Sequence, residues 1–312
     1  MEIINYTDDL KLDNTVITLG KFDGDHLGHR LLFETAVRLK EGGLKSVIFT
    51  FDIHPGNILN KNIPMKYIIT EEERDMSDYP EGIDCLIRFP FNKETMSITS
   101  DSFIRDILVN KLGVKKIVAG SDFRFGKGRE GSIDTLKKAG IEYGFTVHEI
   151  DKVRVMLEGY SYPVEISSTL IKEEIQKGNM ENARAMLGKP FFITGEVMRG
   201  KHLGNTMGFP TVNICPPSDK VMPPNGVYAT WTIIDGMSYN SMTNVGIRPT
   251  FDDGTHISVE TNIFDFDRDI YGEKVTVEFC HFIRPEKKFS GIEELKNAIY
   301  NDREMIKAYF AG

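Results

Sequence analysis

Apolar residues in the first 187 positions follow two alternating patterns, one typical of buried strands and one typical of amphipathic helices. The runs that predict strands lie at 15–19, 46–51, 84–89, 116–119 and 146–150. The helical patterns, such as Leu32, Ala36 and Leu39, lie near 27–41, 71–78, 101–112, 132–143, 168–176 and 180–187. Because strands that alternate with helices return to one sheet by right-handed crossovers, the pattern predicts an α/β domain whose parallel sheet is covered on both faces.

The pattern changes after Gly188-Lys189-Pro190, which interrupts the helical periodicity. Runs that alternate or are β-branched follow at 191–197, 212–214, 227–234, 257–264 and 274–283, with turn signals at Asp235-Gly236 and Asp253-Gly254. Closely spaced antiparallel strands of this kind predict a small closed β-barrel. An apolar stripe predicts a final helix over 291–310. We therefore expect one domain over 1–187 and a second over 188–312.

Composition places the chain among ordinary globular proteins. Its 312 residues are 40% hydrophobic and 27% charged, enough for two domains that each have a core. A net charge of −8 argues against nucleic-acid and anionic-membrane partners, which need a basic surface. The cysteines, Cys85, Cys215 and Cys280, lack metal-site spacing and cannot all pair, which favours a reducing, cytoplasmic compartment. The N-terminus is acidic, unlike a signal peptide, and no segment is apolar enough to predict a membrane span. The oligomeric state stays open.

The most informative stretch is 20–29, between the first predicted strand and the first predicted helix. His26 and His29 are three positions apart, so they share one face of the helix start, beside backbone N–H groups without intrahelical partners. Such a place binds phosphate, and paired imidazoles can stabilise charge that grows on a phosphoryl group. The remaining candidate ligand contacts of the motif are Gly20, Phe22, Asp23, Gly24 and Gly28. A pair of surface histidines on a glycine-rich turn is the alternative, but the position between strand and helix favours a site.

Two further segments of the first domain contain candidate ligand contacts. Phe51-Asp52-Ile53-His54-Pro55 ends the second predicted strand, at the sheet edge where ligands of parallel sheets bind. The segment 120–131 follows the fourth predicted strand and combines aromatics, guanidinium groups and glycines, a mixture suited to a planar ligand that carries phosphate. Its candidates are Asp122, Phe123 and Arg124. A surface loop without a ligand is the alternative interpretation of that segment.

The segment 166–172 is compatible with two roles. Ser167, Ser168 or Thr169 can cap the helix that follows, or the segment, with Lys172, can bind a triphosphate. Zinc chemistry is a competing hypothesis for the histidines. His26, His29 and His54 would form that site, but no carboxylate or cysteine is spaced to complete it.

In the second domain, the candidate chemistry follows a glycine-punctuated loop. Gly200, Gly204 and Gly208 precede a short predicted strand, on which Thr211 and Asn213 project to the same face. Their oxygens are hard ligands suited to magnesium that carries nucleotide phosphates. Glu260 lies on the polar face of another predicted strand, where a rigidly held carboxylate can act as a general base or be an ordinary surface residue. Arg248 lies in a turn rich in potential ligand contacts.

With these motifs in order, the chain resembles the bacterial bifunctional riboflavin kinase/FMN adenylyltransferases, also called prokaryotic FAD synthetases. The resemblance covers nearly the whole length. It rests on GKFDGDHLGH (20–29), FDIHP (51–55), the 120–131 loop, ISSTLIK (166–172), MGFPTVNI (207–214), NVGIRPTF (244–251) and VETNIFDF (259–266). The family implies a Rossmann-like nucleotidyltransferase domain that moves AMP from ATP onto FMN. It also implies a β-barrel domain that phosphorylates riboflavin with ATP and Mg²⁺.

The resemblance also implies residue roles. In the first domain, His26 and His29 would contact ATP phosphates with help from Ser167, Ser168 and Lys172, and the loop around Asp122, Phe123 and Arg124 would hold flavin. In the barrel, Thr211 and Asn213 would hold Mg-ATP, and Glu260 would be the base on the ribityl 5′-hydroxyl.

Four positions depart from the family pattern. Lys172 replaces a usual arginine, Asp25 an apolar residue, Asp122 a frequent asparagine and Asn205 a frequent arginine. Two alternatives therefore stay open: a riboflavin kinase with a degenerate first domain, and a flavin- or nucleotide-binding regulator without turnover.

Overall fold

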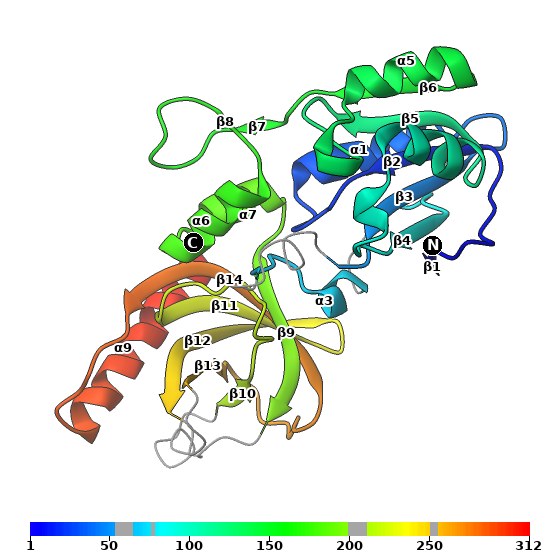
Figure 1. Ribbon diagram of the computed structural model, residues 1–312. Coiled ribbons are helices and arrows are strands. Elements are labelled where there is room, and N and C mark those ends of the chain that lie inside the picture. Colours follow the sequence, from blue (N-terminus) through cyan, green and yellow to red (C-terminus); the bar gives the residue numbers. More distant parts are fainter. Residues whose placement is uncertain (54–64, 76–78, 199–210, 250–254) are drawn as a thin grey trace. The chain divides into compact units, whose positions relative to one another are not determined.

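The computed structural model describes residues 1–53, 65–75, 79–198, 211–249 and 255–312 (Figure 1). The chain forms two compact units. We call Met1–Lys66 with Arg74–Arg154 the sheet unit, and Tyr67–Glu73 with Val155–Gly312 the barrel unit. Several predicted positions lie outside the described residues, namely His54, Gly200, Gly204, Asn205 and Gly208.

The sheet unit contains a six-stranded parallel sheet with the order β1-β4-β3-β2-β5-β6 (Figure 1). Its strands are β1 Glu2–Asn5, β2 Thr15–Leu19, β3 Lys45–Phe51, β4 Cys85–Phe89, β5 Val114–Gly120 and β6 Thr146–Ile150. The sequence predicts all of these except β1. This strand pairs only with β4 among the described strands and is largely exposed, so it has no buried apolar run to reveal it.

Helices cover both faces of this sheet, which confirms the predicted α/β architecture. On one face Phe33 of α1 (Leu27–Arg38) belongs to the same buried cluster as Val16 of β2. On the other face a cluster joins Ile17 to Leu136 of α5 (Ile133–Tyr143) and to a π-helix at Phe103–Val109. The remaining short helices are α3 Glu71–Asp75, which spans the unit boundary, α4 Ser100–Ser102, and 3-10 turns at Thr95–Ser97 and Lys127–Arg129.

The barrel unit contains a closed, six-stranded antiparallel barrel with the order β10-β13-β12-β11-β14-β9 (Figure 1). Its strands are β9 Phe191–Met198, β10 Val212–Ile214, β11 Gly226–Ile234, β12 Met237–Pro249, β13 Thr255–Ile263 and β14 Lys274–Pro285. The C-terminal helix α9, Ile292–Ala311, packs beside β11, β12 and β14 and buries Ile306. The predicted barrel and final helix are thus confirmed.

Strand β12 is absent from the sequence prediction because its inward face carries hydroxyls in place of apolar side chains. The Thr230 hydroxyl contacts those of Ser241 and Thr243 at 2.9 and 2.8 Å, and Thr243 contacts Thr261 at 2.8 Å. All four side chains are fully buried. Because each hydroxyl has a hydrogen-bond partner, the polar interior is compatible with a stable barrel. The same hydroxyls leave the strand without the apolar alternation from which strands are predicted.

Helices α6 (Ser168–Lys177) and α7 (Met180–Leu187) belong to the barrel unit, where α7 packs against β9 and β14. The break between compact units therefore falls at Arg154/Val155, earlier than the predicted domain break at 187/188. A short hairpin of β7 (Arg154–Val155) and β8 (Val164–Glu165) precedes α6.

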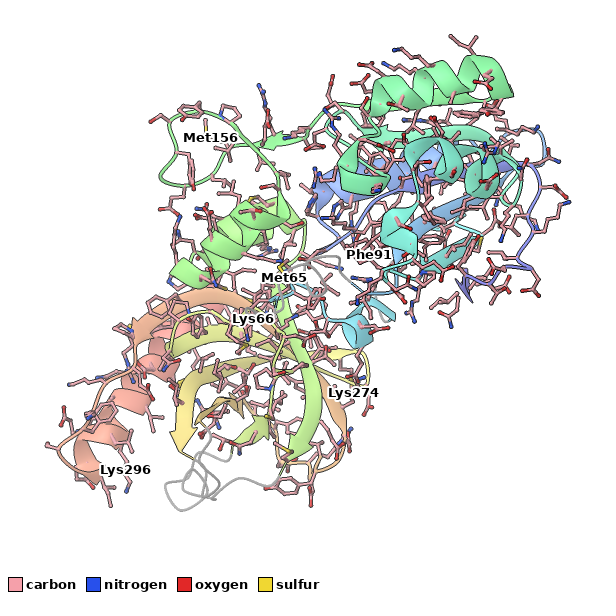
Figure 2. All side chains as sticks on the ribbon, viewed as in Figure 1. Met65, Lys66, Phe91, Met156, Lys274 and Lys296 are labelled. Atoms are coloured by element: carbon pink, nitrogen blue, oxygen red, sulfur yellow. The ribbon has the colours of Figure 1, made fainter. Side chains whose placement is uncertain are left out.

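The segment Tyr67–Glu73 is built into the barrel unit through a buried ion pair. Lys220 Nζ lies 2.5 Å from Glu73 Oε2 and also donates to the Ile68 carbonyl at 2.7 Å. Glu73 Oε1 accepts a hydrogen bond from the backbone N–H of Thr194 in β9 at 3.1 Å. Lys274, labelled in Figure 2, adds an ion pair with Glu72. The segment Tyr67–Glu73, whose acidic sequence is typical of a surface helix, is therefore anchored to the barrel wall.

Two candidate active sites

The first candidate site lies at the N-terminus of α1, at the carboxyl edge of the sheet. His26 is the N-cap, and its Nδ1 accepts a hydrogen bond from the His29 backbone N–H at 3.3 Å. The two imidazoles stack with centroids 3.6 Å apart, and the Phe22 ring meets His29 edge-on at 5.2 Å. The structure thus brings the two predicted histidines together.

The backbone of the motif is held in uncommon conformations. Phe22 and Asp25 have φ of 48° and 45°, and Gly24 has φ of 103°. A Cβ on Gly20 would lie 2.5 Å from the Phe22 ring, so this glycine is needed for close packing. Strain of this kind persists only where surrounding structure enforces it, and it is typical of ligand sites.

Burial in this motif favours the neutral form of both imidazoles. Burial lowers the pKa of His26 to about 4, although the Asp23 carboxylate opposes this shift. Burial lowers the pKa of His29 well below its usual value, and the charges of His26 and Arg74 lower it further. Since His26 Nδ1 accepts a hydrogen bond, neutral His26 carries its proton on Nε2 and can donate from there.

Arg74 is a residue of this site that the sequence analysis missed. It follows three glutamates in a short helix, a pattern typical of a solvated face. In the structure its side chain is 8% exposed, and its Nη1 donates to the Phe51 carbonyl at the end of β3. No sequence signal distinguishes it from a surface arginine.

The predicted flavin loop begins at the carboxyl end of β5. Asp122 is exposed and forms an ion pair with Lys152 at 3.3 Å, which offsets the negative charge that departs from the family pattern. Phe123 stacks on Phe125 with ring centroids 5.7 Å apart. Arg124 is exposed and donates to the Phe123 carbonyl. The three candidates are adjacent and accessible, but their contact with flavin stays a prediction.

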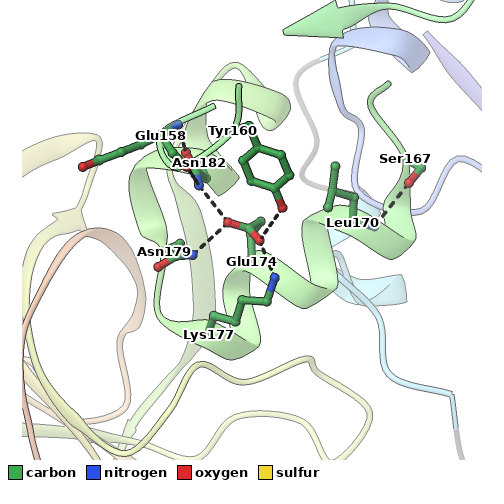
Figure 3. Close-up of polar contacts among 8 residues, drawn as sticks. All are labelled: Glu158, Tyr160, Ser167, Leu170, Glu174, Lys177, Asn179 and Asn182. Carbon is green, nitrogen blue, oxygen red and sulfur yellow. Dashed lines mark hydrogen bonds and ion pairs between the residues drawn. The ribbon is translucent and has the colours of Figure 1, made fainter. Parts of the chain in front are cut away.

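Ser167, Ser168 and Lys172 lie at the start of α6, in the barrel unit. Ser167 is the N-cap, and its Oγ accepts a hydrogen bond from the Leu170 N–H at 3.2 Å (Figure 3). The capping role is therefore observed. The convergence of these residues with His26 and His29 stays a prediction.

A buried carboxylate fixes the other end of α6. Glu174 accepts hydrogen bonds from Tyr160 at 3.1 Å, Lys177 at 2.8 Å, Asn179 at 2.9 Å and Asn182 at 2.8 Å (Figure 3). These donors outweigh the effect of burial and lower the pKa of Glu174 to about 2. The α6–α7 turn and the preceding loop are thereby tied to one charge.

The second candidate site is a cleft of about 310 Å³ in the barrel unit, between the outer face of the barrel and α9. Glu260 and Thr211, both predicted, line it. Its other lining residues come from four strands, α9 and the segment between β14 and α9: Val227, Met242, Asn244, Asn262, Arg284, Glu286, Lys287, Phe289, Leu295, Ile299 and Asp302. Both the barrel and α9 contribute polar and apolar groups, as expected for a small-molecule site.

Strand register brings the predicted barrel residues together. Asn213 of β10 lies directly opposite Glu260 of β13, and Glu260 lies opposite Asn244 of β12. Partners that are directly opposite share a sheet face, so all three point outward with Thr211. The backbone of Arg248 lies in β12, and its side chain lies outside what is described.

An ion pair closes the helix side of the cleft. Arg284 of β14 binds Asp302 of α9 through both carboxylate oxygens, from Nε at 2.9 and 3.1 Å and from Nη2 at 2.8 Å. Asp302 is almost fully buried. This bidentate pair holds α9 against the barrel wall beside Glu260.

Across the described residues, no group of three or more His, Cys, Asp or Glu side chains is arranged to hold a metal ion. The hydroxyl of Thr211, the amide of Asn213 and the carboxylate of Glu260 still offer hard oxygen donors on one face, a set that suits Mg²⁺ accompanied by phosphate oxygens. Within the described part of the chain, no helix combines the length and apolar character needed to cross a membrane.

Comparisons with known proteins find two matching family models. A riboflavin kinase model matches residues 187–310, and an FAD synthetase model matches residues 9–168. Bifunctional riboflavin kinase/FMN adenylyltransferases of Bacillus subtilis and Escherichia coli K12 are 35% and 34% identical, each over 96% of this chain and 93% of the relative. A crystal structure from Streptococcus pneumoniae, titled a macrolide-efflux protein, superposes with a TM-score of 0.88 at 32% identity, covering 98% of this chain and 99% of that one.

Proposed function

This chain belongs to the bifunctional riboflavin kinase/FMN adenylyltransferase family, and we infer that it makes FAD from riboflavin in two ATP-dependent steps. The observation that carries this function is the pairing of Glu260 with Asn213 beside Thr211 on the wall of a cleft, together with the stacked histidines at a helix N-terminus elsewhere in the chain. A mere binder of flavin needs no carboxylate fixed on a strand.

In the barrel unit we assign Glu260 as general base. Its carboxylate takes the proton of the riboflavin 5′-hydroxyl, and the resulting oxygen attacks the γ-phosphorus of ATP, which forms FMN and releases ADP. Glu260 is suited to this role because β13 fixes it between β10 and β12. Thr211 and Asn213 would hold Mg²⁺, which supplies charge neutralisation on the phosphates.

In the sheet unit we assign phosphate binding to His26 and His29. A phosphate oxygen of FMN attacks the α-phosphorus of ATP, the bond to the β-phosphate breaks, and pyrophosphate leaves. Neutral imidazoles act here as hydrogen-bond donors, and the α1 N-terminus adds its backbone N–H groups. Ser167, Ser168 and Lys172 would complete this site, with the flavin held near Asp122, Phe123 and Arg124.

The adenylyltransferase function is proposed for 1–187 and the kinase function for 188–312, even though α6 and α7 pack with the barrel. The motif ISSTLIK (166–172) is thus assigned to the adenylyltransferase function, although it folds as part of the barrel unit. We place the reactions in the cytoplasm, where free thiols such as Cys85, Cys215 and Cys280 persist. The partners are riboflavin, FMN and ATP, with no nucleic acid or membrane involved.

One incubation tests the proposal against its alternatives. The purified chain is supplied with riboflavin, ATP and Mg²⁺, and FMN and FAD are separated by chromatography. Formation of FAD supports two active sites. Accumulation of FMN alone supports a kinase with a degenerate first domain, and the absence of both products supports a binder without turnover.

A further inference from the structure

Arg74 is a buried cation with too few acceptors. Its side chain is 8% exposed, and its bond to the Phe51 carbonyl is long, at 3.5 Å. Its Nε is buried and has no hydrogen-bond partner among the residues that the structure describes. A buried N–H donor without an acceptor is unfavourable. The unpartnered Nε of Arg74 is therefore suited to bind an anionic ligand.

The location of Arg74 is the edge of the sheet at which the glycine–histidine motif lies. Phe51 ends β3, which pairs with β2. The Gly20 N–H donates to the Phe49 carbonyl at 3.2 Å, and the Thr50 hydroxyl donates to the Lys21 carbonyl at 3.3 Å. These bonds place the end of β3 against the start of the motif. Ligands of parallel sheets bind at this edge.

His29 lies close enough for the charge of Arg74 to disfavour its protonation. Its Nδ1 is also buried without a hydrogen-bond partner within the described ranges. Arg74, whose Nη1 contacts the end of β3, and the buried Nδ1 of His29 therefore belong to the same carboxyl edge of the sheet as the α1 N-terminus, which favours negative charge. A ligand that satisfies them must present several anionic oxygens, as a di- or triphosphate does.

We propose that Arg74 is a phosphate-binding residue of the adenylyltransferase site, where it holds the β- and γ-phosphates of ATP and then the pyrophosphate that leaves. This inference rests on the function proposed for the sheet unit. An arginine here supplies the planar, two-pronged recognition of phosphate that Lys172 cannot supply from α6.

The reverse reaction isolates this site, because FAD and pyrophosphate yield FMN and ATP without riboflavin phosphorylation. We expect Arg74→Gln to lower kcat/KM for pyrophosphate about 10²-fold, the effect of losing one strong donor to a developing anion. Arg74→Lys keeps the positive charge but lacks the bidentate geometry of the guanidinium, so kcat/KM for pyrophosphate should fall less than in Arg74→Gln. Arg105→Gln, which removes an exposed arginine of the same unit, should leave the rate unchanged. FMN formation from riboflavin should stay within twofold of wild type in all three variants.

Thermal unfolding separates binding from a structural role. If Arg74 exists to bind phosphate, Arg74→Gln has an unchanged or raised Tm without ligand, because it removes an under-satisfied buried cation. Pyrophosphate should raise the Tm of wild type and of Arg105→Gln, but not that of Arg74→Gln. A lowered Tm together with loss of kinase activity would mean that Arg74 is structural. A wild-type kcat/KM for pyrophosphate in Arg74→Gln would overturn the proposal.

The two levels of inference fail in different ways. If the wild-type chain neither makes FAD nor consumes it with pyrophosphate, the adenylyltransferase function fails. The Tm measurement still decides Arg74 in that case, since it needs only pyrophosphate binding. If the wild type turns over and Arg74→Gln equals it, the function holds and the role of Arg74 is wrong.

Discussion

In the sheet unit, the site-forming Phe22, His26 and His29 belong to ten consecutive residues, whereas the barrel cleft collects side chains from residues 211 to 302. In the first site, burial lowers the pKa of both imidazoles and so favours their neutral form. The second is an open cleft of about 310 Å³ with a carboxylate on its wall. Buried donors suit charge that arrives with a ligand, while an accessible carboxylate suits proton transfer.

The two regions also bury charge differently. The barrel unit buries Glu73 and Lys220 as a pair, with further hydrogen bonds from Thr194 and to Ile68. The sheet unit buries Arg74, which forms one long hydrogen bond with the residues that the structure describes. The first arrangement is complete without a ligand, and the second is not. Because buried polar groups in proteins are usually paired, an incompletely paired arginine is a candidate for ligand binding.

The largest effect is expected from Glu260→Gln, which tests whether the two sites act separately. The amide cannot take the proton of the riboflavin hydroxyl, so FMN formation should fall about 10³-fold. FAD formation from supplied FMN should be unchanged, as measured by chromatography of both flavins. Glu273→Gln, on an exposed barrel carboxylate, is the matched control and should retain kinase activity. Parallel loss of both reactions in Glu260→Gln would refute separate sites.

Glu73→Ala tests the completeness of the buried pair in the barrel unit. The substitution leaves Lys220 charged and buried without its carboxylate, which should lower the free energy of unfolding by about 3–5 kcal/mol in urea titrations. The double variant Glu73→Ala/Lys220→Met removes both charges and should recover most of that stability. A loss under about 1 kcal/mol in the single variant would show that the pair is not the anchor of Tyr67–Glu73.

The proximity of His26 and His29 could be predicted from the sequence because it is local. A strand, a glycine turn and two histidines at helical spacing specify their own arrangement, and the structure brings His26 and His29 into contact as predicted. The proximity of Thr211 and Asn213 to Glu260 cannot be predicted from local sequence, because it depends on the pairing of β10 with β13. The family resemblance supplied that link, and spacing alone did not.

Other features are not readable from the sequence for physical reasons. Strand β12 could not be predicted because its buried Ser241 and Thr243 each hydrogen-bond to the Thr230 hydroxyl, so burial there leaves no apolar pattern. The burial of Arg74 could not be predicted because it depends on the tertiary position of an acidic segment. The assignment of α6 and α7 to the barrel unit also depends on packing with β14, which helical periodicity does not reveal.

His29→Ala is the counterpart of Glu260→Gln, because it should impair FAD formation and leave FMN formation intact. Removing the imidazole should lower FAD formation from FMN about 10²-fold, because one donor to the phosphates is lost. FMN formation from riboflavin should persist, as followed in the same chromatographic assay. Because the Phe22 ring loses a contact partner, folding of the variant needs a control. A cooperative thermal transition of the purified variant would show that it still folds. An unchanged FAD yield would remove the histidines from the mechanism.

The smallest effect concerns the pH dependence that follows from keeping His26 neutral. Its pKa is about 4 when folded and near 6.5 when unfolded, so between these values the unfolded chain binds the extra proton. Stability is therefore highest above about pH 6.5 and falls as pH decreases toward 4, below which this residue causes no further loss.

His26→Asn isolates that contribution, because asparagine still caps α1 but does not titrate. Between pH 7 and pH 5, wild type should lose about 2 kcal/mol more unfolding free energy than His26→Asn, as measured by urea titrations. Equal pH dependence in the two proteins would mean that His26 is solvated and protonates freely. That result would remove the contrast between the buried histidine motif and the barrel cleft, since both would then exchange protons with water.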